Sequence, residues 1–146
     1  MNEEKMGFEF KDEIISDVHF EATGKTINEV FENSALALFS IMYETDKIKP
    51  EQRFEIASEG EDKKELLFNF LTDLIILIET KNMFFSEIKV RIEGNEAEKS
   101  FEAKAFLRGS PAKRDELLCI VKGVTFYKFD LRADDNKYKA TVTVDI

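Results

Sequence analysis

Two aspartates, one near each end of the sequence, are the residues best placed to bind a metal ion. Asp145 precedes Ile146 at the end of a run that alternates apolar and polar residues. The apolar side chain of Ile146 can anchor this end by packing, which leaves its free carboxylate beside that of Asp145. Asp17 occupies the matching polar face of an early strand-like run. If these two strands are neighbours, three carboxylates converge, and we expect a site for Ca²⁺ or Mg²⁺ with oxygen ligands. The alternative is that both aspartates are solvated charges at a sheet edge.

Lys122 is the second candidate, because it interrupts an otherwise apolar run, IVKGVTF. A lysine in such a run must extend to solvent or pair with an anion. Glu79, near the end of an apolar helical segment, is one possible partner. The alternative is a lysine on the exposed face of a strand.

The chain offers little else for catalysis. It has no Walker loop, dinucleotide fingerprint, H-E-x-x-H motif or nucleophile elbow. Its single cysteine, Cys119, lies between two apolar residues, and we expect a small buried hydrophobe rather than a nucleophile. The one histidine, His19, cannot form a multi-histidine zinc site, and we expect it on the surface of a strand.

Hydrophobic periodicity predicts the elements that must position these residues. Thr26 with Glu29, and Asp62 with Glu65, resemble capping boxes that start two helices. The first helix extends to about Tyr43, and the second extends past Glu79. Strands are expected at 14–22, 53–58, 85–93, 98–107, 117–132 (with a break near Gly123) and 138–146, with a hairpin turn at Gly94–Asn95. We therefore predict an α+β fold, with two helices packed on one side of a mostly antiparallel or mixed sheet of six to seven strands.

Length and charge limit the classes of protein that fit. The 146 residues suit one domain, expected to span 1–146, and the single cysteine excludes an internal disulfide. We see no basic and apolar leader and no membrane-length apolar run, so we expect a cytoplasmic protein that does not bind membranes. The net charge of −9 repels phosphate backbones, so we expect no strong autonomous binding to nucleic acid, and a basic partner instead.

Four motifs in order resemble the archease family, the small activators of the RtcB-type tRNA-splicing ligase. An aspartate and strand, then G-K-T and a helix of the N-E-V-F-E-N-S-A-L-A-L-F kind, match residues 17–39. L-L-x-x-x-L, then E-T and F-S-E, match Leu66 to Glu87. V-K-G-V-T-F, from Val121 to Phe126, is similar to a V-K-A-V-T-Y pattern. The chain also closes, as the family does, on an aspartate and an isoleucine.

The resemblance implies an archease-like fold, a function and a set of site residues. The family's metal ligands correspond to Asp17, Asp145 and the carboxylate of Ile146, with calcium as the ion, and its functional lysine corresponds to Lys122. Such a protein is not an enzyme itself. It promotes guanylylation and repeated turnover of the RtcB-type RNA ligase in tRNA splicing and RNA repair, and it widens nucleotide use beyond GTP.

The chain departs from the family pattern at two places. Ile14 and Ile15 replace the usual histidine and threonine of H-T-A-D-V-G, and Asp115 stands about where a histidine is common before V-K-A-V-T. Loss of such supporting groups can loosen a metal site. Two other classes of function stay open, namely a stand-alone metal-dependent phosphohydrolase using the same carboxylates, and a chaperone or adaptor without metal chemistry.

Overall fold

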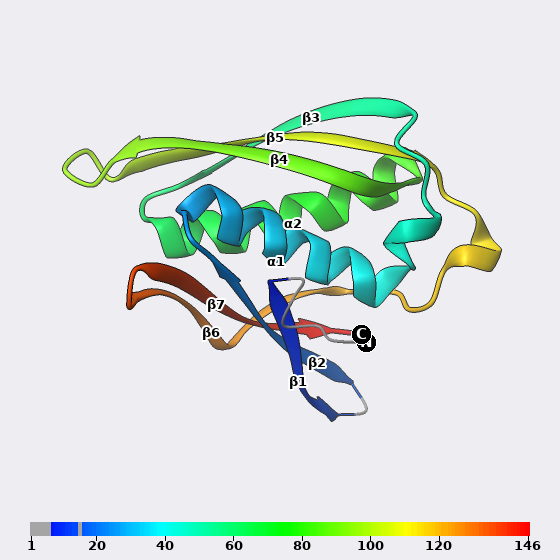
Figure 1. Ribbon diagram of the computed structural model, residues 1–146, viewed down its shortest axis with the longest axis horizontal. Coiled ribbons are helices and arrows are strands. Elements are labelled where there is room, and N and C mark those ends of the chain that lie inside the picture. The colour runs from blue at the N-terminus through cyan, green and yellow to red at the C-terminus, as the bar shows by residue number, and fades with distance from the viewer. Residues whose placement is uncertain (1–6, 15) are drawn as a thin grey trace.

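Two helices lie between two antiparallel sheets in the computed structural model, which describes residues 7–14 and 16–146 (Figure 1). The helices are α1 (Ile27–Met42) and α2 (Lys63–Lys81). The strands are β1 (Phe8–Ile14), β2 (Asp17–Gly24), β3 (Gln52–Gly60), β4 (Met83–Asn95), β5 (Ser100–Pro111), β6 (Gly123–Asp134) and β7 (Lys137–Asp145). Short 3₁₀ turns, η2 (Thr45–Lys47) and η3 (Arg114–Glu116), lie in the connections.

The strands form one sheet in the order β1-β2-β7-β6 and a second in the order β3-β5-β4. Every pairing is antiparallel, and the predicted α+β class with two helices is confirmed. The strands are, however, divided between two sheets, and the helices pack on both. Helix α1 contacts β2 on one side and β4 on the other, while α2 contacts β3 and β6. A helix that is apolar on opposite sides can bury both only by lying between two layers.

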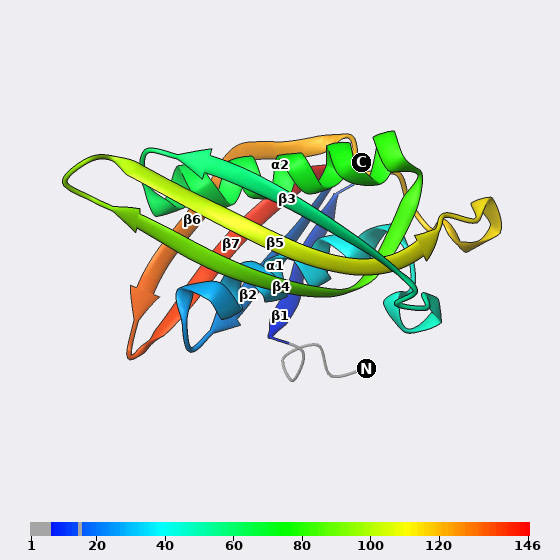
Figure 2. The same cartoon turned by 90° about the horizontal axis from the view of Figure 1, so that it is seen from above.

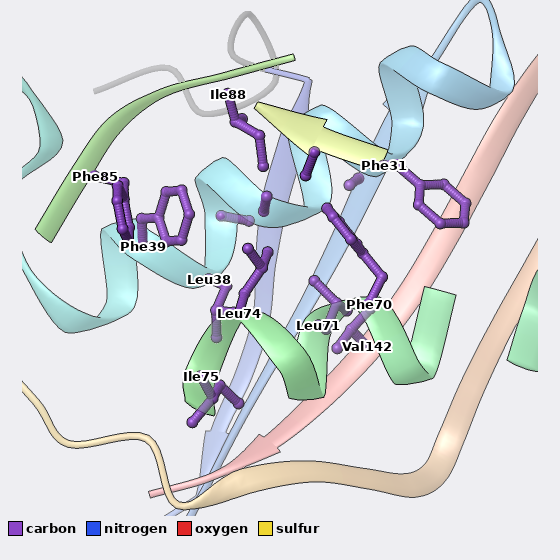
Figure 3. Packing of buried hydrophobic residues seen from close by; sticks show 14 of the residues in the cluster. Phe31, Leu38, Phe39, Phe70, Leu71, Leu74, Ile75, Phe85, Ile88 and Val142 are labelled. Atoms are coloured by element: carbon purple, nitrogen blue, oxygen red, sulfur yellow. The ribbon is translucent and has the colours of Figure 1, made fainter. Parts of the chain in front are cut away.

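The core fills the space between helices and sheets (Figure 3). Apolar side chains along the whole of α2 are buried, as are aromatic side chains of α1 and β4. The labelled members of the cluster are Phe31, Leu38, Phe39, Phe70, Leu71, Leu74, Ile75, Phe85, Ile88 and Val142. Both predicted N-caps are confirmed, because the Thr26 hydroxyl accepts from the N–H of Glu29 and the Asp62 carboxylate accepts from the N–H of Glu65.

Side chains of α1 close the outer edge of β4. The Glu32 carboxylate accepts a hydrogen bond from the N–H of Val90 at 2.8 Å, and the Asn28 amide oxygen accepts from that of Ile92 at 3.1 Å. Beyond the end of α1, the buried Tyr43 hydroxyl both donates to the carbonyl of Phe85 and accepts from its N–H, each at 2.7 Å. These bonds satisfy main-chain groups that an edge strand leaves open.

Some predicted strand boundaries are wrong, and one strand was not predicted. Residues 117–122 are not a strand, because the N–H groups of Leu118 and Cys119 donate to the carbonyl of Met42, which holds the segment against the end of α1. Gly94 and Asn95 belong to β4, and the hairpin turns at 96–99 instead, where the left-handed φ of 50° falls on Lys99. Strand β1 was not predicted, and the early strand begins at Asp17 rather than at residue 14; Ile15 lies outside the described residues.

Neither α1 nor α2 combines the length and the apolar character that a membrane crossing requires, and the described residues contain no other helix that does.

Candidate metal centre

Asp17 and Asp145 lie directly opposite each other on β2 and β7. Opposite residues of an antiparallel pair project to the same face, with Cβ atoms about 4.5–5.5 Å apart. The next pair on this face is His19 with Thr143, whereas the intervening pair, Val18 with Val144, faces the core. The neighbouring strands that the metal-site hypothesis requires are therefore present.

Ile146 continues the pairing past the end of β7. Its N–H donates to the carbonyl of Ser16 at 2.9 Å, and its half-buried side chain packs against the core. This anchors the main chain that follows Asp145 beside the start of β2. Figure 1 shows the C-terminus just past the end of β7, which agrees with this anchoring.

Lys122 is joined to the same place through its backbone. Its N–H donates to the carbonyl of Asp145 at 2.7 Å, and the next residue, Gly123, pairs with Asp145 across β6 and β7. The side chain of Lys122 is exposed, and so is that of Glu79. Within residues 7–14 and 16–146 the two form no ion pair, so the suggested pairing with Glu79 is not found. The alternative, a lysine on the exposed face of a strand, is right about exposure, but Lys122 lies just before the start of β6.

The electrostatics of the aspartate pair favour a cation. In the described part of the chain, no lysine or arginine forms an ion pair with Asp17 or Asp145, so two carboxylates face each other without a compensating charge. Carboxylate oxygens are the donors that Ca²⁺ and Mg²⁺ prefer. No group of three His, Cys, Asp or Glu side chains able to hold a metal occurs among the described residues. A cation here would therefore need further oxygens from the main chain, the terminal carboxylate or water. The donor chemistry fits, and the metal stays a prediction.

His19 was expected on the surface, and that expectation is wrong. The ring is only 8% exposed, and its Nδ1 shares a hydrogen bond of 2.6 Å with the Thr143 hydroxyl. The Tyr127 ring packs beside it, with centroids 5.9 Å apart. Sequence reasoning missed Thr143 and Tyr127 as neighbours of the site. The alternation of the last strand places Thr143 on the face of Asp145, so the signal for that residue was present.

In the described part of the chain, no side-chain hydrogen bond or ion pair joins the remaining candidates to Asp17 or Asp145. Cys119 is half-buried and unpaired with any other cysteine, which agrees only in part with a buried hydrophobe. Asp115, which stands near a histidine position of the family, is exposed in η3. Of the two residues that replace the usual histidine and threonine, Ile15 lies outside the described residues, and only the backbone of Ile14 is described.

The sequence was compared with models of known protein families. The model of the archease protein family matches residues 8–146, which include Asp17, Lys122, Asp145 and Ile146. The chain belongs to the archease family.

Archease relatives match over nearly their whole length. Protein archease of Methanothermobacter thermautotrophicus is 35% identical over 145 residues, covering 96% of this chain and 99% of the relative. Protein archease of Sulfurisphaera tokodaii is 32% identical over 139 residues, covering 95% and 98% respectively.

Solved archease-like structures share the fold. The solution structure of protein 1598 of Methanobacterium thermoautotrophicum superposes with a TM-score of 0.81 at 30% identity, covering 97% of this chain and 99% of that one. A crystal structure from Thermotoga maritima, described as an archease and possible chaperone, gives 0.66 at 20% identity, covering 93% and 95%. The latter likeness is evidence for the fold alone.

Proposed function

We propose that this chain activates an RtcB-type tRNA-splicing RNA ligase, promoting its guanylylation and repeated turnover in tRNA splicing and RNA repair. The protein is a partner of the ligase and does not itself join RNA. The observation that carries the proposal is the meeting of Asp17, Asp145 and the backbone of Lys122 at one end of β7, in a chain of the archease family. Use of nucleotides other than GTP by the activated ligase is part of the same proposal.

Each site residue has a role that follows from its chemistry. Asp17 and Asp145, with the α-carboxylate of Ile146 as third ligand, would hold a calcium ion, or magnesium in its place. The bound ion would supply positive charge for phosphate oxygens. Lys122 is exposed and tied by its main chain to Asp145, so its amine can extend toward the nucleotide phosphates of a docked partner.

A docking surface is available next to Lys122. Leu118 and Ile120 precede it and are 60% and 61% exposed, and Phe126 follows it and is 79% exposed. Large exposed apolar side chains close to a charged site are typical of protein–protein contacts. The charge of −9 complements a basic RNA-binding enzyme and favours fast encounter with it.

Guanylylation of the ligase tests the proposal directly. Purified ligase is mixed with labelled GTP, with and without this protein, and the covalent ligase–GMP adduct is measured. We expect the wild-type chain to raise the rate of adduct formation, and Lys122→Ala to lose about tenfold or more of that stimulation. Lys137→Ala is the matched control, because Lys137 is exposed in the β6–β7 hairpin. Equal stimulation by both variants would exclude the role given to Lys122.

A second candidate function is that of a chaperone. It is favoured by the same exposed apolar side chains, together with Ile76 on α2 and Tyr127 on β6. Such a protein would suppress aggregation of client proteins in a way that Asp17→Ala and Asp145→Ala leave intact. Light scattering of a heated client separates this function from ligase activation.

The stand-alone phosphohydrolase is the remaining alternative. It predicts turnover of generic phosphate esters with Mg²⁺, Mn²⁺ or Ca²⁺, abolished by Asp145→Ala.

A further inference from the structure

Phe106 lies at the centre of the outer face of the three-stranded sheet. Its neighbours across the sheet are Glu55 on β3 and Lys89 on β4. The ring is 38% exposed, and no described element covers this side of the sheet (Figure 2). The opposite side of the same strands packs on the helices, so the core does not account for an aromatic residue at this position.

Basic side chains surround this ring on the same face. The rows on either side of Phe106 place Arg53 beside Arg108, and Lys104 beside Arg91. Together with Lys89 these make five cations, against two acids in the same three rows, Glu55 and Glu87. Of the five, Lys104 approaches Glu102 at 3.9 Å, and the other four form no ion pair within the described residues. A face with excess positive charge is unexpected on a chain of −9.

The face is hollowed where these groups meet. A depression of about 870 Å³ is lined by the outward-facing residues of these rows and extends to Leu36 of α1. The outward-facing residues are three cations (Arg53, Lys89 and Arg108), two acids (Glu55 and Glu87) and Phe106. An exposed aromatic ring at the centre of an antiparallel sheet, flanked by lysine and arginine, matches the chemistry of a single-stranded nucleic acid. The ring offers a flat surface for a base, and the cations lie where phosphates would continue on either side.

We infer that this face binds a short segment of single-stranded RNA, with a base stacked on Phe106 and phosphates on Arg53, Lys89 and Arg108. The choice of RNA over DNA rests on the proposed function, whereas the stacking surface itself does not. An acidic peptide would use the cations but not the flat ring, so it is the weaker fit. The acidic row of Glu59, Glu102 and Glu93 bounds the surface at its far end and limits it to a few nucleotides.

The net charge of the chain limits the affinity without preventing contact. Charges separated by more than about 8–10 Å are screened at ordinary salt, so the local cations dominate once the strand lies on the sheet. We expect a dissociation constant of about 10⁻⁴ to 10⁻⁶ M at low salt, rising steeply with added salt. Such binding is too weak to hold RNA alone, and it would act where the ligase already presents the strand.

Binding of a labelled, unstructured RNA of about ten nucleotides to the isolated protein tests the inference. Fluorescence anisotropy at low salt measures the affinity without any ligase, so the result is independent of ligase activation. We expect Phe106→Leu to weaken binding by about fivefold or more, because base stacking on an aromatic ring is lost. Phe106→Tyr should restore it. Tyr138→Leu is the control, since Tyr138 is a partly exposed aromatic residue of β7 on the other sheet and should leave the affinity unchanged.

Charge variants test the phosphate contacts in the same assay. Lys89→Gln should weaken binding and reduce its salt dependence, and Lys137→Gln should do neither. The inference is overturned if RNA does not bind at low salt, if Phe106→Leu binds as well as wild type, or if an RNA duplex or a poly-glutamate peptide competes as well as the single strand. Equal affinity for single-stranded DNA would overturn the assignment to RNA.

Discussion

Asp17 and Asp145 carry like charges at directly opposite positions of β2 and β7. Opposite like charges destabilise a strand pair by a few tenths to about 1 kcal/mol, and a bound cation removes that cost. We therefore expect Asp17→Asn to raise the free energy of unfolding without calcium, and to abolish any further gain when calcium is added. Thermal melts of both proteins, with calcium and with a chelator, measure the two effects.

Asp134→Asn is the control for this measurement, because Asp134 is exposed at the end of β6 and its change removes the same charge. It should keep the calcium response of the wild type. A wild-type melting temperature that does not respond to calcium would show that this site binds no calcium, while the pairing of β2 and β7 would be unaffected.

Among the described residues, Tyr43 is a buried titratable group with a perturbed pKa. Burial raises the pKa of its phenol far above the usual value, and the hydrogen bond with Phe85 opposes part of that rise. The raised pKa means that the native state keeps the proton while the unfolded chain loses it. Stability should therefore be fully present below about pH 10, the unfolded value, and should fall as the pH rises above it.

Tyr43→Phe should remove that dependence at alkaline pH. At neutral pH it should cost about 1–3 kcal/mol, because the N–H and carbonyl of Phe85 both lose a buried partner. Urea denaturation at neutral and at alkaline pH measures both effects. If the variant loses stability with pH as steeply as the wild type, Tyr43 is not the group responsible.

At the scale of elements, α1 both fills the core and closes the edge of β4. Glu32→Ala should lower the free energy of unfolding by about 1–2 kcal/mol, because the N–H of Val90 loses a charged acceptor. The open edge should also make the protein aggregate faster. Glu32→Gln keeps an acceptor oxygen in place and should retain most of the stability. Equal losses in the two variants, measured by urea denaturation, would show that the bond to Val90 is not what matters.

Elements that are determined by residues close together in the sequence were predicted correctly, whereas elements that depend on distant contacts were not. Helix starts are encoded locally, and Thr26 and Asp62 were both found. Residues 117–122 are apolar and adjoin a strand, but contact with Met42 holds them, and such a contact is not visible in a local pattern. In the hairpin of β4 and β5 the left-handed conformation falls on Lys99, a residue type with no special preference for it. The turn was predicted at Gly94 and Asn95 instead, because these residue types favour such turns.

The part of the site that follows from the alternation of apolar and polar residues along the strands was predicted correctly. Asp17 and Asp145 were placed on matching faces, and β2 and β7 do pair. His19 was misplaced because it lies on the polar face of its own strand, yet Thr143 of β7 and Tyr127 of β6 contact it. Burial of this kind depends on which strands are neighbours, and a single sequence does not state that.

At the scale of the molecule, strand patterns identify an apolar side but not which strands share a sheet. The two sheets were therefore predicted as one, although the apolar residues on several faces of α2 were a sign that it is enclosed.

The acidic surface of the whole molecule leads to a prediction about the salt dependence of docking. If it docks on a basic ligase, the dissociation constant of the complex should rise as salt increases from about 50 to 200 mM, which surface plasmon resonance can follow. An affinity independent of salt would exclude charge as the basis of docking.

Repeated turnover of an RtcB-type ligase is the proposed effect of this protein. The most direct measurement is the amount of RNA joined per ligase molecule when this protein is present in substoichiometric amounts. We expect many joining events per ligase with the wild-type chain, and about one with Asp17→Ala or Lys122→Ala. A folded wild-type chain that leaves a competent ligase at a single turnover would contradict this expectation.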